Sequence, residues 1–114
     1  KNVDNIVAIV DYNKKQIDGP TDDVLSLGDL RAKYESFGWK VWECNGNDMQ
    51  ELVDTFNKIR ENAHKGQSQI LLAHTEMGMG VDFMMGTHKW HGVAPNDEQA
   101  ANALSQLKET LGDY

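Results

Sequence analysis

Residues 6–10 have the sequence Ile-Val-Ala-Ile-Val, and the polar segment 11–20 follows as Asp-Tyr-Asn-Lys-Lys-Gln-Ile-Asp-Gly-Pro. A short, continuous, β-branched run between polar residues is typical of a strand in a parallel sheet. We therefore expect residues 6–10 to form a central strand that is buried on both faces. The Asn, Asp, Gly and Pro residues of segment 11–20 predict a loop. Loops that follow the carboxyl ends of parallel strands bind ligands in open α/β sheets, so this loop is a candidate site.

The rest of the chain alternates between helical and strand patterns. Strands are expected at residues 40–44, nearer a sheet edge, and at 70–73. Helices are expected at residues 28–37 and 49–59, and a last helix is expected to begin near residue 96 and end at Gly112. This order predicts an α/β fold, a parallel sheet with flanking helices that is connected by right-handed crossovers.

Local signals refine the expected helices. Ser26 is expected to cap the first helix and Asn47 the second, because both side chains can accept a backbone N–H. The apolar stripe of the second helix consists of Met49, Leu52, Val53, Phe56 and Ile59. The apolar face of the last helix consists of Ala101, Leu104, Leu107 and Leu111.

Composition excludes several classes of protein. The chain has 114 residues, which fits a single domain over 1–114, and a net charge of −7, which argues against nucleic-acid binding. Its longest apolar run, residues 6–10, is too short to cross a bilayer. A single cysteine, Cys44, cannot form an internal disulfide, which favours a reducing, cytoplasmic location. The chain opens on Lys1 rather than on a methionine, as a fragment would.

Asp11 and Asn13 follow the first predicted strand with one residue between them. Their side-chain oxygens are ligands that Mg²⁺ or Ca²⁺ prefers, and a loop carbonyl can add another. The same residue types also build ordinary turns. The residue types alone therefore leave a metal site and a simple turn open.

A Gly-x-Gly pattern, Gly78-Met79-Gly80, follows the last predicted strand. Glycines at such a place let a backbone approach a phosphate closely. The pattern lacks the third glycine of a dinucleotide-binding fingerprint and the Gly-Lys-Ser/Thr of a P-loop. A flexible loop rich in Gly and Met is the alternative.

His88 and His91 lie three residues apart in the same region. Two histidines could bind zinc, but a structural zinc site needs four ligands, and His74 and Cys44 are remote in sequence. A loop histidine can instead be solvent-exposed, or can donate to a phosphate or a sugar hydroxyl near neutral pH.

Taken together, these pieces resemble the transketolase family over nearly the whole chain. The resemblance rests on residues 5–20, Phe37-Gly38-Trp39, Gly46-Asn47-Asp48, residues 73–80 and residues 90–97. It is strongest for the split transketolases, in which the thiamine-diphosphate-binding half is a separate short chain. The resemblance implies that residues 1–114 form the second half of a thiamine-diphosphate-binding domain.

The resemblance also implies cofactor contacts. Asn13 matches a side-chain ligand of Mg²⁺ (Ca²⁺ could replace it), and Lys15 matches the position whose backbone carbonyl is the next ligand. Ile17 matches a residue that packs on the thiazolium ring, and Met77 one that touches the cofactor from the other side. His91 matches a catalytic histidine near the diphosphate and the donor sugar.

The implied reaction transfers a two-carbon ketol unit between sugar phosphates. In this family a Gly-Asp-Gly segment completes the metal site, and it would precede Lys1. The cofactor is activated by a glutamate of the pyrimidine-binding domain, which belongs to a partner subunit. We therefore expect an oligomeric enzyme, and a 114-residue chain that is inactive by itself.

Two other functions remain open at this point. The chain could be a non-catalytic interaction module derived from the same fold. It could also belong to another thiamine enzyme, such as a deoxyxylulose-phosphate synthase or the thiamine-dependent component of a dehydrogenase. The block Trp90-His91-Gly92, with Ala94-Pro95 after it, favours transketolase.

Overall fold

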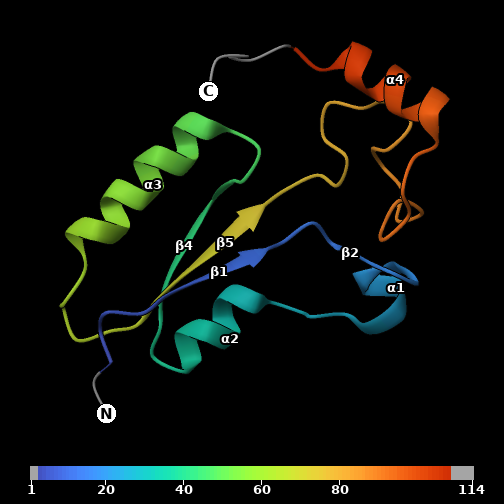
Figure 1. The fold of residues 1–114 in the computed structure, drawn as a ribbon. Coiled ribbons are helices and arrows are strands. Elements are labelled where there is room, and N and C mark those ends of the chain that lie inside the picture. Colours follow the sequence, from blue (N-terminus) through green and yellow to red (C-terminus); the bar gives the residue numbers. More distant parts are fainter. Residues whose placement is uncertain (1–2, 109–114) are drawn as a thin grey trace.

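The computed structural model describes residues 3–108. Three parallel strands form a sheet in the order β1-β5-β4, with helices on both of its faces (Figure 1). The expected α/β fold, a parallel sheet with flanking helices, is confirmed. Its elements are β1 (Val7–Asp11), β2 (Lys15–Gln16), β3 (Gly19–Pro20), α1 (Thr21–Leu25), α2 (Leu30–Ser36), β4 (Lys40–Asn45), α3 (Met49–Glu61), β5 (Gln69–His74) and α4 (Asp97–Gln106).

The central strand is β5, and the expectation that residues 6–10 form it is wrong. Strand β5 pairs with β1 on one side and with β4 on the other, and Leu71 in its middle is 0 % exposed. Strand β1 lies at an edge, and its Ile9 is 59 % exposed. A β-branched run shows that a segment favours a strand, but its place in the sheet depends on distant pairing partners.

Two helices cover opposite faces of the sheet, because alternate residues of β5 point to opposite sides. On one face Leu71 and Ala73 pack in a cluster with Ile59 of α3. On the other face Ile70 and Leu72 cluster with Val41, and residues of α2 pack against them. Figure 1 shows α3 and α2 on either side of the strands.

The helix caps differ from the expected ones by a small shift. Asp29 caps α2 by accepting the N–H of Ala32 at 2.9 Å, and Asp48 caps α3 in the same way. Ser26 lies too early to cap α2, since an N-cap residue directly precedes the first helical residue. Its hydroxyl instead donates to Asp22 of α1.

The expected apolar faces are only partly right. In α3, Ile59 is buried and Leu52 packs against the core, whereas Met49 is exposed. In α4, Leu104 is 70 % exposed and the smaller Ala103 is buried instead. The spacing of apolar residues identifies a helix, but which of its side chains are buried also depends on where the neighbouring segments pack against it.

Helix α4 begins where the sequence predicted, after Asn96. Asn96 and Gln99 form a capping box, in which each side chain accepts the backbone N–H of the other residue. The helix ends at Gln106, earlier than expected, while Leu111 and Gly112 lie outside the described residues. No helix within residues 3–108 is long and apolar enough to cross a membrane.

Segment 11–20 was expected to be a loop, but it contains a small hairpin. Strands β2 and β3 pair antiparallel, with Ile17 and Asp18 as the turn between them, and α1 follows directly. Segment 75–96 is a long connection without helix or strand, as expected. In Figure 1 the hairpin and this connection lie beyond the same ends of β1 and β5.

Candidate functional site

The candidate site lies at the carboxyl edge of the sheet. Because the three strands are parallel, their carboxyl ends meet there, and the segments that follow them come together. Asn13 follows β1, Asn47 follows β4, and Thr75 and Glu76 follow β5. These four side chains line two adjoining clefts.

The first cleft has a volume of about 410 Å³, and the second about 470 Å³. Besides the four shared residues, the first cleft is lined by Tyr12, Lys14, Lys15, Asn45, His74 and Met79. The second is lined further by Asp11, Met77, Gly78, Trp90, His91 and Gly92. Both linings mix polar and apolar surface, with cationic, amide and carboxylate groups beside apolar side chains.

Asn13 is held in place by its own loop. Its Oδ1 accepts the backbone N–H of Lys15 at 2.9 Å, which forms an Asx turn. Thr21 donates its backbone N–H to the Lys14 carbonyl at 2.9 Å, so Lys15 and Pro20 form a non-hydrogen-bonded pair, in which the Lys15 carbonyl points away from the partner strand. The loop therefore offers one remaining lone pair on Asn13 and one backbone carbonyl. Both are the hard oxygen donors that Mg²⁺ prefers.

Glu76 joins three separate segments at the shared wall of the two clefts. Its carboxylate accepts from the Lys15 ammonium at 3.1 Å and from the Gly86 N–H at 2.9 Å. Its own N–H donates to Asn47 Oδ1 at 2.6 Å. The Gly86 N–H, and then Lys15, hold the pKa of Glu76 below its ordinary value of 4.5. The carboxylate is therefore ionised at neutral pH.

The long connection after β5 also lines the second cleft, and several contacts hold its residues in place. The Thr75 hydroxyl donates to the Asp11 carboxylate, which joins the ends of β5 and β1. Trp90 donates its indole N–H to the Phe83 carbonyl at 3.0 Å, and the two rings pack edge to face at 5.3 Å. The Trp90–Phe83 contacts hold the connection together beside His91, which lines the second cleft together with Asp11 at the end of β1.

Gly78 is needed for packing within this connection. It has a φ of +72°, and a Cβ there would lie 2.5 Å from the Cβ of Met84. The sequence suggested that the Gly-x-Gly pattern lets the backbone approach a phosphate. At Gly78 the close approach is to the chain's own Met84, which is a structural reason for the glycine.

The structure brings most of the predicted site residues together. Asn13, Lys15, Met77 and His91 all line the two clefts. Ile17 does not, because it lies in the hairpin turn with 65 % of its surface exposed. The functional roles assigned to these residues stay predictions.

A zinc site finds no support in the geometry. Within residues 3–108 there is no group of three or more His, Cys, Asp or Glu side chains that could hold a metal ion. Cys44 is buried against α3, where it acts as a small core residue. The carboxylates at this edge, Asp11 and Glu76, accept hydrogen bonds from Thr75 and from Lys15 and Gly86.

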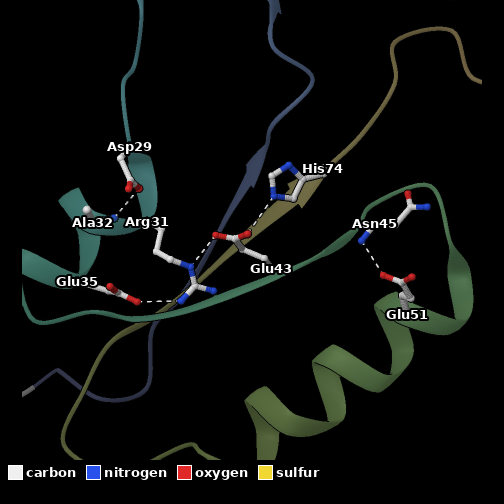
Figure 2. Close-up of polar contacts among 8 residues, drawn as sticks. All are labelled: Asp29, Arg31, Ala32, Glu35, Glu43, Asn45, Glu51 and His74. Carbon is white, nitrogen blue, oxygen red and sulfur yellow. Dashed lines mark hydrogen bonds and ion pairs between the residues drawn. The ribbon is translucent and has the colours of Figure 1, made fainter.

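A row of hydrogen-bonded polar side chains lies beside the first cleft, and the sequence analysis did not predict it. His74 Nε2 lies 3.3 Å from Glu43, which accepts from Arg31 Nε at 2.8 Å, and Arg31 also donates to Glu35 at 2.9 Å (Figure 2). Burial raises the pKa of Glu43, but the hydrogen bonds from Arg31 and His74 outweigh it, so the pKa lies below its ordinary value. Only the alternation of polar and apolar residues in β4 pointed to Glu43.

Asn47 and Glu76 were also missed as functional candidates. The sequence predicted Asn47 to be a helix cap, and Glu76 was only one residue of the segment rich in Gly and Met. No local pattern reveals the contact of Glu76 with Lys15 or that of Asn47 with Glu76, because each joins residues that are far apart in the chain.

Comparison with other proteins finds relatives that are named as transketolase subunits. The chain is 39 % identical over 109 residues to an apulose-4-phosphate transketolase subunit of Phocaeicola vulgatus. It is 38 % identical over 107 residues to the protein of the same name from Actinobacillus succinogenes. These matches cover 96 % and 94 % of the chain, but the chain spans only 38 % of the length of each relative.

Solved structures show the same fold. A transketolase from Campylobacter jejuni matches 92 % of the chain with a TM-score of 0.81 at 24 % identity, and the match covers 16 % of that structure. A family model described as transketolase, thiamine diphosphate binding domain, matches residues 1–112. The shared fold, the relatives and this nearly complete match agree, and the chain belongs to the transketolase family, within its thiamine diphosphate binding domain.

Proposed function

We propose that the chain forms the second half of the cofactor-binding domain of a thiamine-diphosphate-dependent transketolase. In this proposal it helps to transfer a two-carbon ketol unit between sugar phosphates. The observation that carries the proposal is the position of Asn13, Lys15, Met77 and His91 around two adjoining clefts at the carboxyl edge of the sheet. The relatives named for apulose-4-phosphate support a sugar phosphate as substrate.

The chain's residues suit a cofactor held through a divalent cation. Asn13 and the Lys15 carbonyl would hold Mg²⁺, and the Asx turn fixes the amide oxygen before any ion arrives. Met77 would offer an apolar contact, and His91 would hold a proton near the diphosphate or a donor hydroxyl. When bound, thiamine diphosphate supplies the carbon centre that takes up and releases the two-carbon unit.

Charge balance explains why a cation is needed. The chain carries a net charge of −7, and the charge of Lys15 is offset by Glu76 at 3.1 Å. Position 77, which lines the second cleft, is a methionine and adds no positive charge. The positive field for a diphosphate therefore has to come mainly from Mg²⁺ and from loop N–H groups.

We further propose that a second, complementary polypeptide completes the enzyme. Two relatives are named as subunits of a transketolase, and the chain spans only part of their length. The partner would supply the activating glutamate, and the rest of the cofactor domain would supply the Gly-Asp-Gly segment. An oligomeric, cytoplasmic assembly is part of this proposal, and the 114-residue chain is expected to be inactive by itself.

A binding experiment tests the proposal. The full-length protein that contains this chain, together with its partner polypeptide, is titrated with thiamine diphosphate and Mg²⁺ by calorimetry. Asn13→Ala is expected to weaken binding by about tenfold or more, since it removes a metal ligand and the Asx turn. Asn57→Ala serves as the control, because Asn57 lies exposed on α3 away from both clefts. Wild-type affinity in Asn13→Ala would contradict the metal role.

A further inference from the structure

A row of side-chain contacts leads across the sheet to the loop that carries Asn13. Arg31 of α2 donates to Glu43 of β4 at 2.8 Å, and Glu43 lies 3.3 Å from Nε2 of His74 at the end of β5 (Figure 2). The His74 ring packs in turn on the Tyr12 ring, with the ring centres 5.3 Å apart. The row therefore joins α2, β4 and β5 to the residue that directly follows β1.

The apolar core on the α2 side of the sheet explains why these side chains meet. The buried cluster on this face takes in one residue from each strand, namely Val10, Val41 and Leu72. The residue two positions further along each strand belongs to the row, namely Tyr12, Glu43 and His74. Because every second side chain of a strand points to the same face, the polar row continues the core towards the carboxyl edge.

Tyr12 stands where β1 ends and the loop 12–15 begins. Its backbone N–H donates to the Ala73 carbonyl at 2.8 Å, so the main chain stays paired with β5 up to this residue. Beyond it Lys14 has a left-handed backbone, with a φ of +57°, and its ammonium lies 5.8 Å from the centre of the Tyr12 ring. The Tyr12 ring therefore contacts His74 in β5 and Lys14 in the loop.

Asn13 lies between these two loop residues. Its Oδ1 accepts the backbone N–H of Lys15 at 2.9 Å, in a turn that passes through the left-handed Lys14. Such a conformation is unfavourable for a residue with a Cβ, and it persists only where surrounding contacts hold it. The contact of Lys14 with the Tyr12 ring is one of these contacts. A Tyr12 ring that moved freely would loosen the turn that aims the Asn13 amide.

The contacts of the row suit orientation better than overall stability. The side chains of Arg31, Glu43 and His74 are between 33 % and 45 % exposed, and ion pairs at such exposure stabilise a fold only slightly. Glu43 nevertheless accepts from two sides, so its carboxylate is held between α2 and the His74 ring. A ring with one bonded nitrogen and a neighbouring ring has little freedom to turn.

We propose that Glu43 and His74 position the loop 12–15 for a bound divalent cation. Glu43 orients the His74 ring, this ring supports Tyr12, and Tyr12 supports the turn that holds the Asn13 amide. The inference rests on the proposed function, in which Asn13 and the Lys15 carbonyl hold Mg²⁺. Glu43 and His74 act through Tyr12 and touch neither the cation nor the cofactor.

Two measurements on the full-length protein, in complex with its partner polypeptide, test this inference. Hydrogen exchange of the Lys15 amide is followed without metal or cofactor, and Mn²⁺ affinity is measured by EPR with thiamine diphosphate present. His74→Ala is expected to speed this exchange and to weaken Mn²⁺ binding by about tenfold, the lower end of the cost of losing an outer partner of a metal site. Faster exchange that a lower urea midpoint fully explains would overturn the inference, since the role would then be structural only.

Two conservative variants separate the ring from its hydrogen bond. His74→Phe keeps a ring beside Tyr12 but cannot bond Glu43, and Glu43→Gln keeps the His74 ring but removes the charge that faces it. Both are expected to weaken Mn²⁺ binding by about threefold, the scale of one exposed ion pair. A loss in His74→Phe as large as in His74→Ala would overturn the inference, because the imidazole itself would then contact the ligand.

A double-mutant cycle shows whether His74 acts through Tyr12. If it does, His74→Ala is expected to change neither the Lys15 exchange nor the Mn²⁺ affinity further once Tyr12→Ala is present, because effects of coupled residues do not add. Fully additive losses would overturn the inference, since His74 would then reach the cation site without Tyr12.

A second carboxylate–histidine pair provides the matched control for Glu43→Gln. Asp4 Oδ1 lies 3.6 Å from Nδ1 of His64, but Asp4 precedes β1 and so lies at the opposite end of the sheet. Asp4→Asn is expected to change neither the Lys15 exchange nor the Mn²⁺ affinity. Equal effects of Asp4→Asn and Glu43→Gln would overturn the inference.

The wild-type protein separates this inference from the proposed function. Wild-type protein that binds neither Mn²⁺ nor thiamine diphosphate would overturn the proposed function. Wild-type protein that binds both, with unchanged Lys15 exchange and Mn²⁺ affinity in His74→Ala, would overturn the inference alone.

Discussion

The Lys15 ammonium lies 3.1 Å from the Glu76 carboxylate, and this contact joins the loop after β1 to the long connection after β5. Each partner also belongs to a second contact. Lys15 donates its backbone N–H to Asn13, and Glu76 accepts the N–H of Gly86. A change at Glu76 is therefore expected to act on the proposed metal loop and on the long connection at once.

Replacing Glu76 separates its two roles. Glu76→Gln keeps an oxygen for the Gly86 N–H but removes the charge that faces Lys15, whereas Glu76→Ala removes both contacts. Hydrogen exchange at the Gly86 amide is expected to be fastest in Glu76→Ala, intermediate in Glu76→Gln and slowest in the wild type. Equal exchange in all three proteins would show that Glu76 does not order the connection.

The same carboxylate predicts a dependence on pH. The pKa of Glu76 is lowered in the folded protein, first by the Gly86 N–H and then by Lys15. A lowered pKa means that the ionised contact stabilises the fold above the ordinary value of 4.5, and that this contribution is lost as pH falls through the folded value. An NMR titration should show the Gly86 amide signal moving below pH 4.5 in the wild type and staying constant in Glu76→Gln.

Neighbouring residues Asn47 and Asp48 are expected to have different roles. Asp48→Ala removes the cap of α3, whose carboxylate accepts the Glu51 N–H at 2.9 Å, and should cost about 1 kcal/mol of unfolding free energy in urea titrations. Asn47→Ala leaves that cap intact and should instead shift the NMR signal of the Glu76 amide. The opposite assignment of effects would mean that Asn47 is the cap.

Two leucines test the position of the core. Leu71 is 0 % exposed in the central strand, so Leu71→Ala should lower the unfolding free energy by about 2–5 kcal/mol. Leu104 is 70 % exposed on α4, so Leu104→Ala should cost less than about 1 kcal/mol. Urea unfolding of both variants checks the difference. Similar losses would place Leu104 in a buried environment and contradict the described packing of α4.

Much of the fold could be predicted from local patterns. The β-branched and apolar runs correspond to β1 and β5, and the alternation at residues 40–44 corresponds to the edge strand β4. Strand order could not be predicted, because a β-branched run looks the same in an edge strand and in a central one. The hairpin of β2 and β3 was not predicted. Each of its strands has two residues, which is too few to show an alternation of polar and apolar side chains.

The candidate site also contains residues that the sequence could predict and residues that it could not. Asn13 and His91 stand in local motifs, so the sequence pointed to them directly, and the structure places both on the clefts. Glu76 carries no local signal, because its partner Lys15 lies sixty-one residues away in the chain. Ile17 shows the converse case, in which a motif position is exposed in a turn instead of reaching either cleft.

The strand order also sets the sequence in which the molecule is expected to fold. Strands β4 and β5 are joined through α3 and can pair within one continuous βαβ unit. Strand β1 pairs with β5, from which it is separated by all the intervening elements of the chain. Closing so long a loop costs more conformational entropy, so this pairing is expected to form more slowly than that of β4 with β5. Asn13 and Lys15 follow β1, whereas Asn47 and Glu76 follow β4 and β5. We therefore expect the site to be assembled late in folding, when β1 docks onto a unit that has already formed.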